Sequence, residues 1–262
     1  MCPSPQLVTQ FDNARTGMSG KGLQRESLTK RIRKESHGLW DWTIYYKLDQ
    51  SRLGTKELKV VLDNKLDITD PILLAHEEER ISKIAALALY GDGTLDALVP
   101  GTFATLSAIH ARLFGDLYSF AGKVRTENLA MGGFRFASAL YLESAIKAVE
   151  RMPQDTFDHV VEKYVEMNVA HPFREGNGRA TRIWLDHIFR RELRRTVDWT
   201  RIDRESYLLA MERSPVRDTE IKSLLSAALC ERLDDISLLA RGIDASYSYE
   251  GYTAYRAEDL RD

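Results

Sequence analysis

The chain has 262 residues and a formal net charge of -2 at pH 7. This length is enough for one sizeable domain with a smaller appendage. With 44% hydrophobic and 29% charged residues the composition is that of a soluble globular protein, and no apolar run reaches the roughly 20 residues that a membrane helix needs. The near-neutral charge argues against a protein that coats nucleic acid through its overall field.

The amino terminus and the cysteines give no sign of export. The first residues lack a basic start followed by an apolar stretch, so we expect no secretory signal. Cys2 and Cys230 are the only cysteines, and they form neither a disulfide framework nor a metal-binding spacing. We therefore expect a cytoplasmic protein that does not associate with a membrane.

Residues 1–62 are predicted to be a small extension whose fold the sequence does not define. A basic stretch between residues 21 and 36 favours either a solvated helix face or a docking patch for nucleic acid or a partner. Glu26 and Glu35 dilute its charge, which favours the solvated face. An aromatic-rich cluster follows at residues 40–46, with the composition of a short strand or of a segment that packs on the main body.

From about residue 63 the hydrophobic pattern is helical. Asp70 fits an N-cap and Pro71 the first position of a helix that ends at the Gly-Asp-Gly sequence of residues 91–93. Apolar residues repeat at helical spacing in four further segments, which are 103–113, 157–169, 204–213 and 220–239. Another helix is expected after Gly176. The fold class is therefore mainly α.

One β element is predicted between these helices. Residues 123–137 contain two short strand-like runs on either side of Gly132 and Gly133, which are permissive turn residues. We expect a β-hairpin there.

The segment His171-Pro-Phe-Arg-Glu-Gly-Asn-Gly-Arg-Ala-Thr-Arg182 joins two predicted helices. The Gly176-Asn177-Gly178 turn leads into a helix start, where backbone N–H groups lack intrahelical acceptors and the helix dipole favours an anion. Arg179 and Arg182 lie three residues apart, where both guanidinium groups can bind phosphate oxygens. This pattern predicts a site for several phosphates in a row.

Two further residues of this segment fit phosphate chemistry. Glu175 would repel phosphates unless a divalent cation such as Mg²⁺ bridges its carboxylate to them. His171 has a side chain whose ordinary pKa is near neutrality, so its neutral imidazole can take a proton from an incoming hydroxyl.

These residues resemble the signature of the Fic (filamentation induced by cyclic AMP) family, H-x-F-x-[D/E]-G-N-G-R-x-x-R. Every specified position is met by residues 171–182. The resemblance extends over about residues 63–255 and includes residues 113–126, which look like the helix that leads into the family's hairpin. It implies a Fic-type helical domain at 63–239 with a β-hairpin flap, followed by an inhibitory helix and tail at 240–262.

The resemblance also implies roles for the motif residues. His171 is the general base for a target hydroxyl, Phe173 anchors the loop, and Glu175 ligates Mg²⁺ on the α- and β-phosphates of ATP. Gly176, Asn177 and Gly178 form the anion hole at the α-phosphate. Arg179 then binds the β-phosphate and Arg182 the γ-phosphate.

The implied activity is that of a protein adenylyltransferase, which transfers AMP from ATP to a Ser, Thr or Tyr hydroxyl of a target protein and releases pyrophosphate. The kinase-like Doc branch carries Lys in place of the second motif glycine, and Gly178 argues against that branch. The edge of the flap is expected to take the target segment as an added strand through Gly133, Phe134, Arg135 and Phe136. A purely structural hairpin is the alternative.

Near the carboxyl end, Ser246-Tyr-Ser-Tyr-Glu250-Gly251 resembles the family's inhibitory motif [S/T]-x-x-x-E-[G/N]. It stands where the small single-chain class of Fic proteins carries its inhibitory helix. If this helix packs against the active-site helix, we expect Glu250 to pair with Arg182 where the γ-phosphate should sit, and Ser246 to hydrogen-bond near Asn177 or its loop. A plain amphipathic tail is the alternative.

Other functions stay open at this point. The same fold can act as a deAMPylase, transfer UMP or phosphocholine, or serve as a catalytically silent phosphate-binding docking module; the intact His171 favours the enzyme. A DNA-associated toxin is disfavoured because no metal–carboxylate cluster accompanies Glu175. The sequence does not define the target protein, the modified residue or the oligomeric state, and a homo-oligomer is compatible with it.

Overall fold

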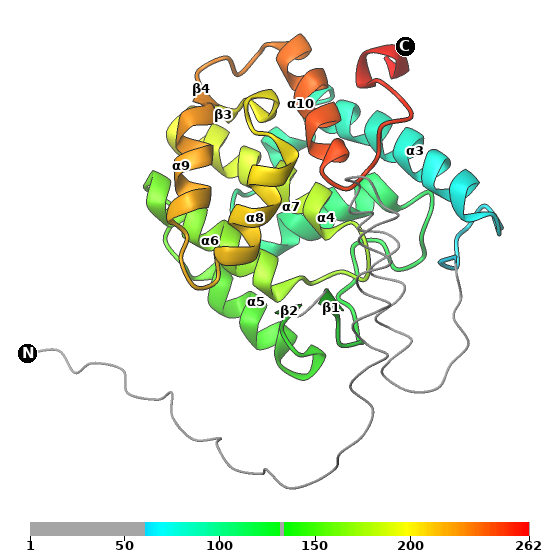
Figure 1. Cartoon of the computed structure of the whole chain (residues 1–262), viewed down its shortest axis with the longest axis horizontal. Helices are drawn as coiled ribbons and strands as arrows, with labels where there is room; N and C mark the ends of the chain where they lie inside the picture. The colour runs from blue at the N-terminus through cyan, green and yellow to red at the C-terminus, as the bar shows by residue number, and fades with distance from the viewer. Residues whose placement is uncertain (1–60, 132–133, 262) are drawn as a thin grey trace, which may run out of the picture. The chain divides into compact units, whose positions relative to one another are not determined.

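The computed structural model of the protein describes residues 61–131 and 134–261 (Figure 1). The basic stretch, the aromatic cluster and Gly133 lie outside the described residues. The described part is mainly α-helical, as the sequence predicted. Its helices are α3 (Pro71–Gly91), α4 (Phe103–Phe114), α5 (Leu142–Glu150), α6 (Phe157–Ala170), α7 (Asn177–Ile188), α8 (Arg204–Arg213), α9 (Thr219–Ala228) and α10 (Ile236–Ser248). None of these helices is both long and apolar enough to span a bilayer.

Polar side chains cap the starts of α3, α4, α6, α8 and α10. Asp70 accepts hydrogen bonds from the backbone N–H groups of Ile72 and Leu73, with Pro71 in the first turn of α3. Thr156 caps α6 in the same way, and Asp235 caps α10. Each cap satisfies N–H donors that have no intrahelical acceptor.

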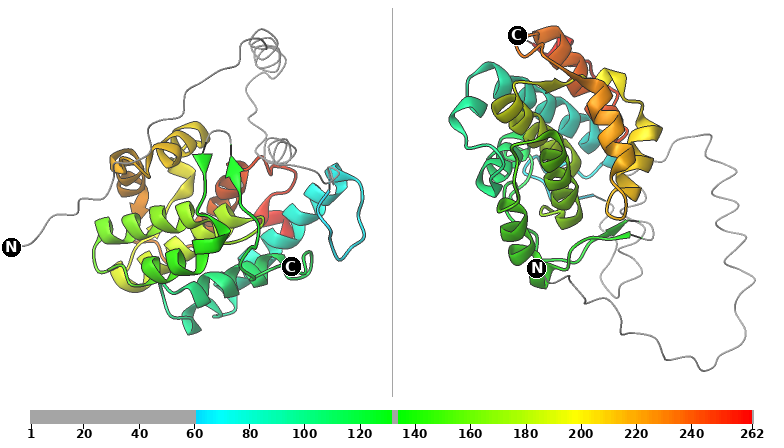
Figure 2. Two further views of the ribbon diagram at one scale, coloured as in Figure 1. Left: turned by 90° about the horizontal axis from the view of Figure 1, so that it is seen from below. Right: turned by 90° about the vertical axis from the view of Figure 1, so that its left-hand side faces the viewer.

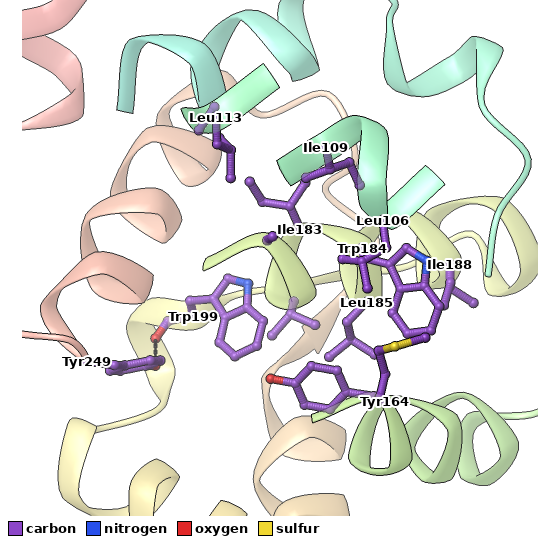
Figure 3. Close-up of a cluster of buried hydrophobic side chains, with 14 of the residues drawn as sticks. Leu106, Ile109, Leu113, Tyr164, Ile183, Trp184, Leu185, Ile188, Trp199 and Tyr249 are labelled. Carbon is purple, nitrogen blue, oxygen red and sulfur yellow. Dashed lines mark hydrogen bonds between the residues drawn. The ribbon is translucent and has the colours of Figure 1, made fainter. Parts of the chain in front are cut away.

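Helix α7 lies in the centre of the core and is buried on almost all sides. It packs against α4 and α6, so that Ile183 faces Ile109 and Leu113 of α4 (Figure 3). The Trp184 indole is fully buried, and its Nε1 donates a hydrogen bond to the carbonyl oxygen of Thr102 at 3.0 Å. The motif that begins α7 is therefore built on a closely packed part of the core.

The predicted hairpin is present as β1 (Ala130–Met131) and β2 (Phe134–Arg135), which pair antiparallel (Figure 2). A second antiparallel pair, β3 (Thr196–Val197) with β4 (Leu229–Cys230), was not predicted. The segment 220–239, expected to be one helix, is divided by β4 because Leu229 takes an extended conformation and pairs with Val197. Helical spacing of the apolar residues cannot reveal a strand partner so distant in sequence.

Helix α10 and the residues after it lie beside α3, the first helix of the described residues (Figure 1). Helix α10 begins at Ile236, so the expected boundary between residues 239 and 240 falls inside it. Lys83 of α3 is buried and lies 3.0 Å from Glu79 and 2.7 Å from Asp244 of α10. Its Nζ also donates a hydrogen bond to the carbonyl oxygen of Tyr255 at 2.6 Å. A buried polar network thus holds the tail against α3.

His110 of α4 connects the core to the loop before α7. Its Nδ1 accepts a hydrogen bond from the N–H of Gly122 at 2.9 Å, so its Nε2 carries the proton that is donated to the carbonyl oxygen of Glu175 at 2.8 Å. The imidazole also stacks on Phe173, with 3.8 Å between the ring centroids. Burial lowers the pKa of His110 to about 4.

We predict that Lys83→Ala strongly destabilises the fold. The substitution leaves the buried Glu79 carboxylate without its cation, which costs about 3–5 kcal/mol of the free energy of unfolding. Chemical denaturation of the purified protein measures this loss. The control is Lys147→Ala at an exposed position of α5. Equal stabilities of the two variants would contradict a stabilising network around Lys83.

We predict a second effect, on the pH dependence of stability. The pKa of His110 is lower in the folded chain than the ordinary value near 6.5 in the unfolded chain, so the unfolded chain binds the proton first as the pH falls. This group therefore removes about 2 kcal/mol of stability between pH 8 and pH 5. Denaturation curves of His110→Gln should lose less stability over that range than the parent. The exposed His76→Gln should follow the parent, and parallel curves for all three proteins would refute the assignment.

Candidate active site

The loop between α6 and α7 has two residues in left-handed conformations. His171, directly after α6, has a φ of 49°, and Gly176, directly before α7, has a φ of 73°. A Cβ at Gly176 would overlap the Phe114 ring, so only glycine fits this turn without a shift. These turns place His171 and the first turn of α7 on the same site.

The Asn177 side chain closes the loop on itself. Its Oδ1 accepts a hydrogen bond from the N–H of Phe173, and its Nδ2 donates one to the carbonyl oxygen of Phe173, both at 2.8 Å. Phe173 is fully buried, as expected for a loop anchor. These hydrogen bonds fix the loop. The N–H groups at the start of α7 have no intrahelical acceptor, so they are suited to bind an anion.

His171 is held as a neutral imidazole. Its ring stacks on Phe136 of the flap, with 3.7 Å between centroids. Burial and the charge of Arg125 lower the pKa of His171 to about 3. The side chain can therefore accept a proton at every pH above that value.

Arg125, which the sequence analysis missed, joins the flap to this loop. Its Nε donates a hydrogen bond to the carbonyl oxygen of His171 at 2.7 Å, and its Nη2 donates to those of Ala137 at 2.6 Å and Ala170 at 3.1 Å. One guanidinium thus fixes the end of α6, the base and the strand exit of the hairpin together.

The flap residues differ in what they contact. Arg135 is exposed and Phe134 is partly buried, whereas the ring of Phe136 packs on His171. A change at Phe136 would therefore disturb His171 directly, whereas a change at Phe134 would not remove this stacking contact.

The carboxylate of Glu250 bridges both motif arginines. Its Oε1 accepts a hydrogen bond from Nη2 of Arg182 at 2.6 Å, and its Oε2 accepts one from Nε of Arg179 at 2.8 Å. The expected contact with Arg182 is present, and the contact with Arg179 was not predicted. Although burial raises the pKa of Glu250, the two guanidinium groups outweigh burial and lower the pKa below its ordinary value. The carboxylate is therefore ionised.

Ser246 takes a different partner from the one expected. Its hydroxyl accepts a hydrogen bond from Nε of Arg182 at 2.6 Å, and its carbonyl oxygen accepts one from Nη2 of Arg182 at 2.9 Å. The expected position near Asn177 is wrong because α10 packs beside the middle of α7, where Arg182 lies.

Two glycines permit the approach of Glu250. A Cβ at Gly178 would overlap its carboxylate, so the bare first turn of α7 allows this contact. Gly251 has a φ of 88°, a left-handed conformation in which the chain turns from α10 back toward α3. The backbone conformation at Gly251 favours glycine, whereas a Cβ at Gly178 would displace the Glu250 carboxylate.

Glu175 lies at the edge of this cluster. Its Oε1 accepts a hydrogen bond from the N–H of Gly176 at 3.1 Å and lies 3.7 Å from Nη2 of Arg179. Burial and the neighbouring Glu78 raise its pKa to about 7. In the described part of the chain no three His, Cys, Asp or Glu side chains gather as a metal site. A single carboxylate suits Mg²⁺ that takes its other ligands from phosphates and water.

Comparisons with known proteins agree with this geometry. The family model of the Fic/DOC family matches residues 100–189. Protein adenylyltransferase VbhT of Bartonella schoenbuchensis is 30% identical over 131 residues, which are 46% of this chain and 27% of that protein. The probable protein adenylyltransferase Fic of Salmonella typhimurium is 29% identical over 139 residues, 49% of this chain and 67% of that protein.

A solved structure shows the same fold. The BepC protein of Bartonella tribocorum, a VirB-translocated effector crystallised with bound AMPPNP, superposes with a TM-score of 0.53. The match is 20% identical and covers 67% of this chain and 95% of that one. Residues 100–189, which include the complete motif, therefore form a segment that matches the Fic/DOC family.

Proposed function

We propose that this protein transfers AMP from ATP to a hydroxyl side chain of a target protein, and that Glu250 restrains the reaction. One observation carries the proposal. The ionised Glu250 carboxylate binds the arginine pair at the start of α7, which is the anion site expected for phosphates. A carboxylate in this position mimics a phosphate oxygen and competes with it.

The phosphate site is assembled from α7 and its loop. Backbone N–H groups at Gly176, Asn177 and Gly178 would stabilise the charge that develops on the α-phosphate. Arg179 would bind the β-phosphate and Arg182 the γ-phosphate, once Glu250 has left them. The names of the two curated relatives, both adenylyltransferases, and the AMPPNP bound to the solved neighbour support a nucleotide substrate.

His171 supplies the base. It accepts the proton of the target hydroxyl, and the hydroxyl oxygen then forms a bond to the α-phosphorus. The bond from that phosphorus to the bridging oxygen breaks, and pyrophosphate leaves in line with the attacking oxygen. The stacked Phe136 and the hydrogen bond from Arg125 to the His171 carbonyl oxygen hold the base in place for this step.

Glu175 would hold Mg²⁺, which when bound would supply positive charge to neutralise phosphate oxygens. The flap edge would bind the target as an added strand. Tyr247 and Tyr249, the tyrosines nearest to Glu250, are buried in the docked tail, each 1% exposed, and would not accept AMP in this state. The hydroxyl group that receives AMP must therefore come from elsewhere while α10 is docked.

We predict that Glu250→Gly raises AMP transfer at least ten-fold, because Arg179 and Arg182 become available for phosphates. Incubation with labelled ATP, Mg²⁺ and a cell lysate, followed by intact mass spectrometry, measures the transfer. Glu258→Gly, at an exposed carboxylate of the same tail, is the matched control and should stay at the parent's rate. Adding His171→Ala to Glu250→Gly should abolish incorporation while ATP still binds. Unchanged AMP incorporation in Glu250→Gly would contradict the proposed restraint by Glu250.

We also predict a pH effect on the metal dependence of the released variant. Because the pKa of Glu175 is near 7, its ionised fraction rises about ten-fold from pH 6 to pH 8. The apparent affinity for Mg²⁺, measured by titration at fixed ATP in Glu250→Gly, should therefore increase about ten-fold over this range. Glu175→Gln in the same background shares the titration of ATP itself and controls for it. If both proteins gave the same pH profile, Glu175 would not be the metal ligand.

A further inference from the structure

A second buried carboxylate contacts the arginine pair from α3. Glu78 is 3% exposed, and its Oε1 lies 2.8 Å from Nη2 of Arg179. It lies outside the segment 100–189 that matches the family model. Neither the proposed phosphate site at the start of α7 nor the proposed restraint by Glu250 gives this carboxylate a role.

The two carboxylates hold different atoms of the same guanidinium. Glu250 accepts a hydrogen bond from Nε of Arg179, whereas Glu78 faces Nη2. Because the guanidinium is planar and rigid, an ion partner 2.8 Å from Nη2 restrains its position even when the partner at Nε has gone. Withdrawal of Glu250 would then leave Nε pointing at the space that the carboxylate occupied.

Arg179 also needs a permanent partner for energetic reasons. It is 0% exposed and lies between the rings of Phe114 and Tyr252, whose centroids are 4.8 Å and 4.4 Å from its Cζ. Its Nη1 and Nη2 make no hydrogen bond of good geometry within the described residues. Without Glu250 and Glu78 this buried charge would face only the more distant Glu175 carboxylate, 3.7 Å from Nη2. Glu78 prevents this when Glu250 leaves.

Glu78 is itself held in place. Tyr252 donates a hydrogen bond from its hydroxyl to Oε1 of Glu78 at 2.6 Å, and the Tyr118 hydroxyl donates one to Oε2. Tyr118 is fixed in turn by stacking on Phe120, with 4.7 Å between centroids. The carboxylate thus has a defined direction before any nucleotide arrives.

We propose that Glu78 is a positioning residue that orients Arg179 for the β-phosphate once Glu250 is withdrawn, with Tyr118 holding Glu78. This proposal rests on the proposed function, because it takes Arg179 as a phosphate ligand. The competing interpretation is that Glu78 only docks the tail, as its neighbour Glu79 does. Glu79 is equally buried and accepts hydrogen bonds from the N–H groups of Ala254 and Tyr255.

Binding of ADP by the Glu250→Gly variant tests the proposal, since ADP carries a β-phosphate and needs no acceptor. Isothermal titration should show that adding Glu78→Gln lowers the ADP affinity at least ten-fold. In steady-state assays the same change should raise the KM for ATP and alter kcat less than three-fold. Glu79→Gln is the matched control, from the same helix and with the same burial, and should change the ADP affinity less than two-fold.

A double-mutant cycle separates positioning from a general loss of structure. In an Arg179→Lys background Glu78→Gln should have no further effect on the ADP affinity, because Glu78 acts through Arg179. If Glu78→Gln fails to fold, Tyr118→Phe carries the test and should lower the ADP affinity about three-fold. An unchanged or higher ADP affinity overturns the proposal, and so does an equal loss in Glu79→Gln or in the Arg179→Lys background.

The outcomes also separate this proposal from the proposed function. If Glu250→Gly binds ADP in a manner that depends on Glu78 but transfers no AMP, the function fails and the positioning role stands. If it transfers AMP and Glu78→Gln leaves ADP binding intact, the function stands and the positioning role fails. Absence of any ADP binding in Glu250→Gly removes both.

Discussion

The site depends on keeping two arginines charged and ordered inside a protein core. Arg179 and Arg182 are almost completely buried at the start of α7, and a buried charge is tolerated only with a well-placed partner. Carboxylates from α3 and from the end of α10 provide that partner. A phosphate chain would satisfy the same donors, so the proposed substrate could replace the Glu250 carboxylate without leaving the arginines unpaired.

The surrounding elements serve this arrangement. Helix α4 fixes the loop through His110, Arg125 fixes the base and the flap, and α3 holds the tail through Lys83. Each is a single polar side chain that bonds to a backbone or carboxylate of another element, inside a packed core. The loop before α7, the flap and the tail are therefore each connected to a neighbouring element by a direct polar contact.

Much of this was predictable where the signal is local. The start of α3 follows from its cap Asp70, and the hairpin around residues 130–135 follows from its turn residues. The motif at residues 171–182 follows from its fixed spacing. Glu78 and Arg125 were missed because a charged residue on an amphipathic segment looks like a solvated one, and its burial is decided by partners far away in sequence. For the same reason β3 and β4 gave no signal, since each has only two residues and pairs at long range.

The contacts of Glu250 differ from those of the motif loop in how far apart their partners lie along the chain. Phe173 and Asn177 are four residues apart, whereas Glu250 is 68 residues from Arg182 and Tyr252 is 174 from Glu78. Contacts over long separations must offset the entropy of closing a large loop. The contact between Glu250 and the arginine pair therefore carries a larger cost in chain entropy than the contacts that close the motif loop, and the packing of the tail on α3 has to offset that cost.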